Sequence, residues 1–446
     1  KVTVSVLYWR ANTYQRGYIS SSNAMADPNN PKAVVRHMLS RIGHIWEDVT
    51  DLIIRPPRAT YRPNALGPRL FRINAKSRDC FARQDLELTN VRGMKLQCSW
   101  YRQVDPAAYQ LYMDEQRRGA GTKEAAERAL EAVASMPATT ARAPCMVYLH
   151  GNCGSRLDAR DCLFLLEEGI SVFAVDLSGS GQSDGDFVSL GYYERQDLLA
   201  IVDHLTLSKQ VSAIGVWGRS MGAVTAIMYA ARDPTVSCIV CDSPFSSLEL
   251  LAKDLAMMHA SWVPDFAVGS IVGKIRDTVL ERAGFDIRDL DTLKYARGSH
   301  VPAFVFHGED DDFVRYEHSQ AVADHYAGSC IHHVVKGDHN STRRNDVRDI
   351  ARAFARLYLI EKPEEAAKRA AKFEDLPPPP VGNATETVTP ASGEDTRSVE
   401  TDAGEAAEAE GTPGDSSAGY TSSGHDADLD TSAHNESAAA AEDSDV

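Results

Sequence analysis

Ser220 lies in the pentapeptide GRSMG at residues 218–222, which has the pattern GxSxG. A serine hydroxyl is a poor nucleophile unless a base and backbone N–H donors lie beside it. A sharp turn from a strand into a helix presents the serine in this way. An apolar run at 211–217 precedes the motif and a helix-forming stretch follows it, ending at Asp233-Pro234. This context predicts that Ser220 is a nucleophile; the alternative is a tight strand-helix turn with an incidental serine.

A nucleophilic serine needs a base, and the base needs a carboxylate that orients it. The segment GDHN at 337–340 follows an apolar run, so His339 is our candidate base, whereas His332 and His333 lie within that run and are interpreted as structural. Four aspartates that follow apolar runs are candidates for the acid: Asp242, Asp310, Asp311 and Asp312. Their positions alone leave the choice open. The candidates then follow in the chain order Ser, Asp, His.

The negative oxygen of a tetrahedral intermediate needs two N–H donors. Met221, the residue after the serine, supplies one. The segment HGNCGS at 150–155 follows the first predicted parallel strand, and we expect the second donor to be the N–H of Asn152, with that of Cys153 as the alternative. The same segment also fits a glycine-rich turn in which Ser155 caps a helix.

Short apolar runs alternate with amphipathic stretches over most of the chain. The predicted strands are 146–149, 172–175, 213–217, 237–241, 303–306 and 332–335. The predicted helices include 157–168 and 192–205. This alternation indicates an α/β fold with a mostly parallel sheet and helices on both faces. The site is then expected at the carboxyl ends of the strands.

Four further segments complete the predicted organisation. Residues 85–88 and 94–100 predict a hairpin, residues 104–143 a helical surface insertion, and residues 248–299 a small helical lid over the strand ends. Residues 33–54 have helical apolar spacing that stops at Pro56-Pro57. We interpret this last segment as a helix docked on the main domain; attachment to a membrane surface is the alternative. The resulting domains are an extension over 1–60, a main domain over 61–362 and a tail over 363–446.

The net charge of −16 belongs almost entirely to the tail. Residues 376–446 contain 16 acidic residues and one basic residue, which leaves a net charge of −1 for residues 1–375. A nearly neutral main domain argues against nucleic acid as a partner. The tail has few apolar residues, so its composition predicts disorder and a role in binding proteins.

The eight cysteines lack the regular spacing of a disulfide framework, which predicts a reducing, cytoplasmic setting. Cys238 and Cys241 form a CxxC within a predicted strand, where residues three apart face opposite ways, so no metal site is expected. The composition suggests no cofactor. The chain begins with Lys1, which fits a fragment or a leader ahead of Met25.

Taken together, these motifs resemble the α/β-hydrolase superfamily, most of all its serine aminopeptidase S33-like, Bem46-like and ABHD17-type branch. The motifs that carry the resemblance are HGNCGS at 150–155, DLSGSGQSDG at 176–185, GRSMG at 218–222, DSPF at 242–245, HGEDDDFV at 307–314 and GDHN at 337–340. The resemblance implies that Asp311 is the acid and His339 the base. Arg219 stands where the family commonly has Gln or His, and Cys153 where it commonly has Ala.

The resemblance and the residues together predict a serine hydrolase of carboxylic esters or thioesters, with Ser220, His339 and Asp311 as its triad. A peptidase or amidase that uses the same residues is the alternative within enzymes. The alternative from another class is an interaction protein whose hydrolase domain serves as a scaffold.

Overall fold

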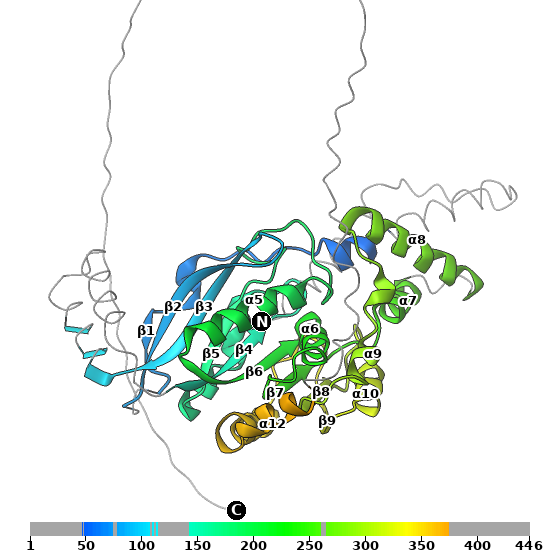
Figure 1. Ribbon diagram of the computed structural model, residues 1–446. Helices are drawn as coiled ribbons and strands as arrows, with labels where there is room; N and C mark the ends of the chain where they lie inside the picture. The colour runs from blue at the N-terminus through cyan, green and yellow to red at the C-terminus, as the bar shows by residue number, and fades with distance from the viewer. Residues whose placement is uncertain are drawn as a thin grey trace, which may run out of the picture. The chain divides into compact units, whose positions relative to one another are not determined.

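The computed structural model describes residues 47, 49–74, 78–107, 109–110, 113–114, 142–259 and 265–373. Within these residues nine strands form one sheet in the order β1-β2-β3-β5-β4-β6-β7-β8-β9 (Figure 1). The strands are β1 (Leu70–Phe71), β2 (Cys80–Thr89), β3 (Lys95–Val104), β4 (Ala143–Leu149), β5 (Ser171–Val175), β6 (Val211–Arg219), β7 (Cys238–Asp242), β8 (Ala303–Gly308) and β9 (Cys330–Val335). The pairs β1–β2, β2–β3 and β3–β5 are antiparallel. All neighbouring pairs among β4 to β9 are parallel.

This sheet confirms the predicted α/β-hydrolase fold. The predicted hairpin is the antiparallel pair β2–β3, and the six predicted parallel strands are β4 to β9. The parallel strands bring the turns that carry the candidate residues to one edge of the sheet, because the carboxyl ends of parallel strands all point the same way.

Two apolar layers cover the two faces of the sheet. One face packs against α5 (Glu194–Ser208), α6 (Met221–Ala230) and α9 (Thr292–Ala296), and the other against α11 (Asn345–Arg356). Alternate strand residues enter the two layers, since successive side chains of a strand point to opposite faces. Cys241 lies in the first layer and Cys238 in the second, so the two thiols of the CxxC point apart as predicted.

The predicted amphipathic helix over 157–168 is wrong in type. The structure has two 3₁₀ helices there, η2 (Arg156–Asp161) and η3 (Leu163–Glu168). Four buried residues recur at intervals of three: Arg156, Ala159, Cys162 and Leu165. This is the period of a 3₁₀ helix, whereas an α-helix of period 3.6 would turn some of them to solvent. Ser155 caps the first of the two through a capping box with Asp158.

The segment between β7 and β8 is helical, as expected. It contains α7 (Leu248–His259), α8 (Asp265–Ala283), η4 (Ile287–Asp289) and α9, and α7 and α8 lie side by side (Figure 1). Residues 49–54 are also helical, and Val49, Ile53 and Ile54 are buried in the main apolar layer. The described part of the N-terminal helix is therefore docked on the domain.

The remaining described helices are η1 (Pro63–Leu66), α10 (Tyr316–Asp324), the π-helical η5 (Leu357–Glu361) and α12 (Glu364–Phe373). Residues 33–46, most of the insertion over 104–143 and residues 374–446 of the predicted tail lie outside the described residues. The first part of the predicted tail, 364–373, is the helix α12, and Arg369 in it donates to the carbonyls of Pro234 and Val236.

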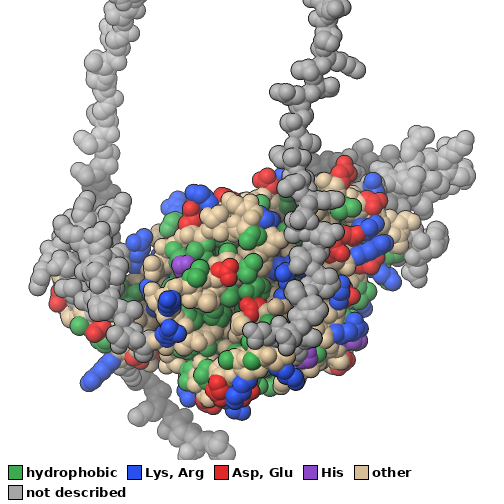
Figure 2. All heavy atoms as spheres, in the orientation of Figure 1, with side chains coloured by type: hydrophobic (Ala, Val, Ile, Leu, Met, Phe, Trp, Pro, Cys, Tyr) green, Lys and Arg blue, Asp and Glu red, His purple; other side chains and the backbone are tan. Residues whose placement is uncertain are grey.

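Basic and acidic side chains are interspersed over the face of the described part in view (Figure 2). This mixture agrees with the nearly balanced charge of residues 1–375. None of the helices that the structure describes has the length and apolar character needed to cross a bilayer.

Candidate active site

Ser220 lies at the turn between β6 and α6 with a backbone φ of 50° and ψ of −113°. This conformation is strained for a residue with a side chain, and such strain is typical of a serine held at a nucleophile elbow. The N–H of Ser220 donates to the carbonyl of Asp242, at the end of the neighbouring strand β7, over 2.7 Å. The turn is thereby fixed to the sheet.

The two glycines of the motif let the chain pass at close range. A Cβ at Gly218 would lie 2.1 Å from the carbonyl oxygen of Gly222, and a Cβ at Gly222 would lie 2.2 Å from that of Leu149. Both distances are too short for any side chain. The elbow therefore requires glycine at both positions for steric reasons.

The structure brings Ser220, His339 and Asp311 into one hydrogen-bonded chain. The Nε2 atom of His339 is 3.1 Å from the Oγ atom of Ser220, and its Nδ1 atom is 2.6 Å from the Oδ2 atom of Asp311. All three residues are buried, with exposed fractions of 5 to 8%. The carboxylate faces Nδ1, so the proton of a neutral imidazole is held on Nδ1, and Nε2 is free to accept the proton of the serine.

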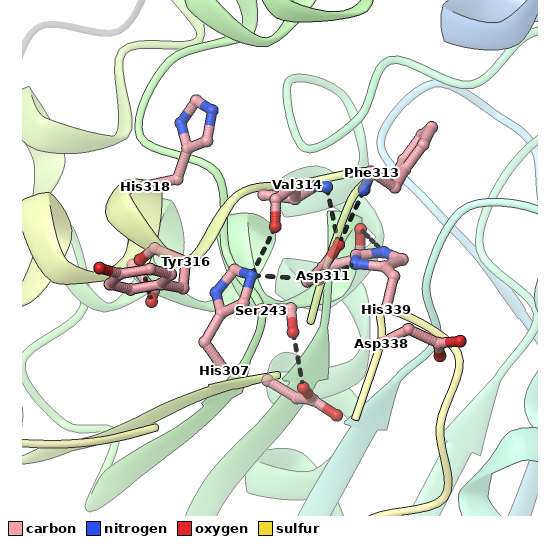
Figure 3. A network of polar contacts seen from close by, with 12 residues as sticks. Ser243, His307, Asp311, Phe313, Val314, Tyr316, His318, Asp338 and His339 are labelled. Carbon is pink, nitrogen blue, oxygen red and sulfur yellow. Dashed lines mark hydrogen bonds and ion pairs between the residues drawn. The ribbon is translucent and has the colours of Figure 1, made fainter. Parts of the chain in front are cut away.

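The carboxylate of Asp311 is surrounded by donors (Figure 3). Its Oδ1 atom accepts the N–H groups of Phe313 and Val314, and its Oδ2 atom lies 3.1 Å from Nε2 of His307 as well as beside His339. Burial alone would raise the pKa of Asp311, but the charge of His339 and hydrogen bonds from both histidines outweigh it and hold the pKa well below its usual range. Asp311 is therefore a stable anion.

The other three candidate acids are placed differently. Asp310 and Asp312 are exposed. Asp242 is buried, but its carboxylate accepts hydrogen bonds from Nε and Nη2 of Arg343 over 2.7 to 3.1 Å. Of the four, Asp311 is the one whose carboxylate meets His339.

His307 is a residue of the site that the sequence analysis missed. Its Nε2 atom lies 2.7 Å from the carbonyl of Val314 and 3.1 Å from Asp311, so this nitrogen carries the proton. The signal that could have found it is its place at the start of the HGEDDDFV segment, four residues before Asp311.

The segment 150–155 lies directly against the elbow, since a Cβ at Gly151 would be 3.5 Å from the Cβ of Ser220. The N–H of Cys153 donates to the side-chain oxygen of Asn152, which leaves the N–H of Asn152 as the better candidate for the second oxyanion donor. The N–H of Met221 is the first in α6 and has no acceptor within the helix. His150 accepts the N–H of Leu177 and is structural.

Cys153 is the one cysteine of the segment 150–155, and burial raises the pKa of its thiol to about 12. A thiol of this kind is protonated at neutral pH and is a weak nucleophile. Among the described residues, no group of three or more histidine, cysteine, aspartate or glutamate side chains is placed to hold a metal ion.

A small cavity of about 10 Å³ lies beside Ser220. Apart from Ser220 and Asn152 its walls are apolar: Leu52, Ile53, Leu190, Phe245, Leu251, Leu255 and Phe313. The volume is that of about one water molecule. Residues of the N-terminal helix and of α7 thus line the small space beside Ser220.

A second group of a serine, a histidine and an aspartate connects α7 with α10. The Oγ atom of Ser246 is 2.8 Å from Nδ1 of His318, whose Nε2 atom is 3.2 Å from Asp254. The backbone N–H of Ser246 also donates to Nδ1, and the serine is only 2% exposed. This group joins α7 to α10 and lacks the strained turn that presents Ser220.

Residues 140–286 match the family model described as serine aminopeptidase, S33. The uncharacterized protein YqkD of Bacillus subtilis is 27% identical over 202 residues, which are 44% of this chain and 64% of that protein. An uncharacterized 31.7 kDa protein of Escherichia coli, from the traX-finO intergenic region, is 27% identical over 121 residues, 26% of this chain and 42% of that protein. The chain thus spans less than two thirds of either relative.

Among solved structures, an esterase of Pyrococcus furiosus has a TM-score of 0.48 and 21% identity, over 69% of this chain and 98% of its own. The acetyl xylan esterase of Paenibacillus sp. R4 has a TM-score of 0.47 and 14% identity, over 72% of this chain and 95% of its own.

Proposed function

This chain belongs to the α/β-hydrolase superfamily, and we propose that it hydrolyses carboxylic esters or thioesters through an acyl-enzyme on Ser220. The observation that carries the proposal is the hydrogen-bonded chain from Ser220 through His339 to Asp311, with its distances of 3.1 and 2.6 Å. Its members stand in the order and geometry that a general-base mechanism requires.

In this mechanism His339 takes the proton of Ser220 at Nε2 while the Oγ atom attacks the carbonyl carbon. The imidazolium then protonates the leaving alcohol or thiol, and a water molecule, activated by the same nitrogen, releases the acid and frees Ser220. Asp311 holds the imidazole in the required tautomer and stabilises its charged form. The N–H groups of Met221 and Asn152 hold the negative oxygen.

The walls of the cavity favour an apolar acyl group. Seven of its nine lining residues are aliphatic or aromatic, and none of the nine is acidic. An aminopeptidase needs a negative group to receive the substrate's ammonium, so the described lining favours an ester or thioester over a peptide with a free amino terminus. Because the cavity is small, we expect the acyl group to displace the side chains of the N-terminal helix or of α7.

Labelling with a fluorophosphonate probe, followed by turnover of p-nitrophenyl esters of increasing acyl length, tests the proposal. Ser220→Ala should abolish both labelling and turnover, since loss of such a nucleophile costs on the order of 10⁶ in rate. Ser246→Ala is the matched control, because it removes another serine whose hydroxyl contacts a histidine beside an aspartate. Labelling that survives in Ser220→Ala, or disappears in Ser246→Ala, would refute the assignment of the nucleophile.

A further inference from the structure

A buried ion cluster lies behind the candidate active site. It is centred on Asp242 at the end of β7, with Arg343 from the loop that carries His339 and Arg219 from the position before the nucleophile. Asp161 of η2 also lies 3.8 Å from Nη1 of Arg219. Nε and Nη2 of Arg343 bind the carboxylate of Asp242, and Nε of Arg219 lies 3.8 Å from it. The side chains of Asp242 and Arg343 are only 5 and 9% exposed.

Both arginines also donate to the backbone of the loop that carries His339. The Nη2 atom of Arg219 lies 2.6 Å from the carbonyl oxygen of His339, and the Nη1 atom of Arg343 lies 3.0 Å from that of Asp338. The loop's own amides are used within it, since Asp338 N–H donates to Ser341 and Asn340 N–H donates to Asp338. Arg219 therefore ties this loop to the elbow, and Arg343, which is itself part of the loop, ties it to Asp242 at the end of β7.

The same cluster is tied to the nucleophile. The carbonyl of Asp242 accepts the N–H of Ser220, and Arg219 is the residue before that serine. The carboxylate of Asp242 balances the positive charge of the arginines, which outweigh the effect of burial and keep its pKa below the ordinary value. The ion cluster therefore contacts both the turn that carries Ser220 and the loop that carries His339.

We propose that Arg219, Arg343 and Asp242 form a clamp that holds His339 at its distance from Ser220. This inference rests on the proposed function, because it assigns His339 as the base. None of the three side chains contacts the Oγ atom of Ser220 or the imidazole of His339, so they are positioning residues. A guanidinium can hold a backbone carbonyl and a carboxylate at once through separate N–H groups, which a lysine ammonium does with less fixed geometry.

The first test removes the donors of Arg219. Arg219→Met should lower kcat by about 10- to 100-fold, the cost of a small misplacement of a reacting group, with KM and melting temperature nearly unchanged. Arg219→Lys should recover part of the loss. Arg352→Met is the control, because Arg352 contacts Glu168 and Phe164 and not the His339 loop. A kcat within twofold of wild type in Arg219→Met would overturn the proposal.

The second test separates positioning from stability. Arg343→Met should lower both kcat and melting temperature, because it leaves a buried carboxylate with a weaker partner. The double variant Asp242→Leu/Arg343→Met should recover most of the melting temperature, since replacing both partners of a buried pair by apolar residues is often neutral. It should not recover kcat. Recovery of both would show that the cluster only stabilises the fold. Turnover that survives in Ser220→Ala would instead refute the proposed function itself.

Discussion

Asp311→Asn is expected to lower kcat by about 10⁴, the loss typical of a triad whose acid becomes an amide. This corresponds to about 5.5 kcal/mol in the activation free energy. The structure gives the reason, because each carboxylate oxygen of Asp311 faces two donors. Oδ1 faces the N–H groups of Phe313 and Val314, and Oδ2 faces His339 and His307.

An asparagine at position 311 has one oxygen and one NH₂ group, so it fails in either orientation. If the NH₂ group faces His339, the imidazole must accept at Nδ1, and its proton moves to Nε2, where it blocks proton transfer from Ser220. If the NH₂ group faces the two backbone N–H groups, buried donors face one another. Each donor left without an acceptor then costs about 1 to 3 kcal/mol. Either arrangement also removes the negative charge that stabilises the imidazolium.

The assay compares kcat and kcat/KM for a short p-nitrophenyl ester in Asp311→Asn, Asp310→Asn, Asp312→Asn and Asp242→Asn. The exposed Asp310 and Asp312 are matched controls, because their variants make the same chemical change beside the site and should stay within about twofold of wild type. Asp242→Asn should lie between the controls and Asp311→Asn, since it weakens the clamp and leaves the triad intact. If Asp242→Asn were the more damaging change, the assignment of the acid would be wrong.

Three further outcomes are expected. The folded-state pKa values of Asp242 and Asp311 lie below the ordinary value of about 3.9. The stability that these carboxylates contribute is therefore complete above that pH and is lost as the pH falls further. The melting temperature of the wild type should fall below about pH 4, and that of the Asp242→Leu/Arg343→Met variant should fall less steeply. Leu255→Ala should enlarge the cavity at Ser220 and raise kcat/KM for longer acyl esters relative to acetate, while costing about 2 to 5 kcal/mol of stability; an unchanged chain-length profile would show that α7 does not line the acyl site. Deleting residues 376–446 should leave turnover of a small soluble ester within about twofold and raise the isoelectric point, because this acidic segment is too polar to contribute to a core; a large fall in turnover or melting temperature would mean that the tail folds onto the domain.

The strands and the positions of the candidate residues could be read from the chain because their signals are local. A run of apolar residues such as 303–306 must be buried on both faces, and the turn after it must lie at the carboxyl edge of a parallel sheet. That is sufficient to place Ser220 and His339 near one another. The acid could not be fixed in the same way, since Asp310, Asp311 and Asp312 differ by single positions. The resemblance alone identified Asp311 as the acid. In the structure Asp311 is buried beside His339, whereas Asp310 and Asp312 are exposed.

Other features depended on contacts between segments far apart in the chain. The 3₁₀ geometry of 156–168 follows the spacing of residues that the neighbouring strands bury, and helix propensity does not report that spacing. The clamp consists of Arg219, Asp242 and Arg343, which are far apart in the chain. The cavity likewise lies between Leu52 and residues of α7. A local sequence pattern cannot predict contacts between segments so far apart. The sequence by itself determined which segments are buried and where the reactive side chains fall. Only the tertiary structure decided which charges meet and which residues line the site, because these depend on how independent elements pack against one another.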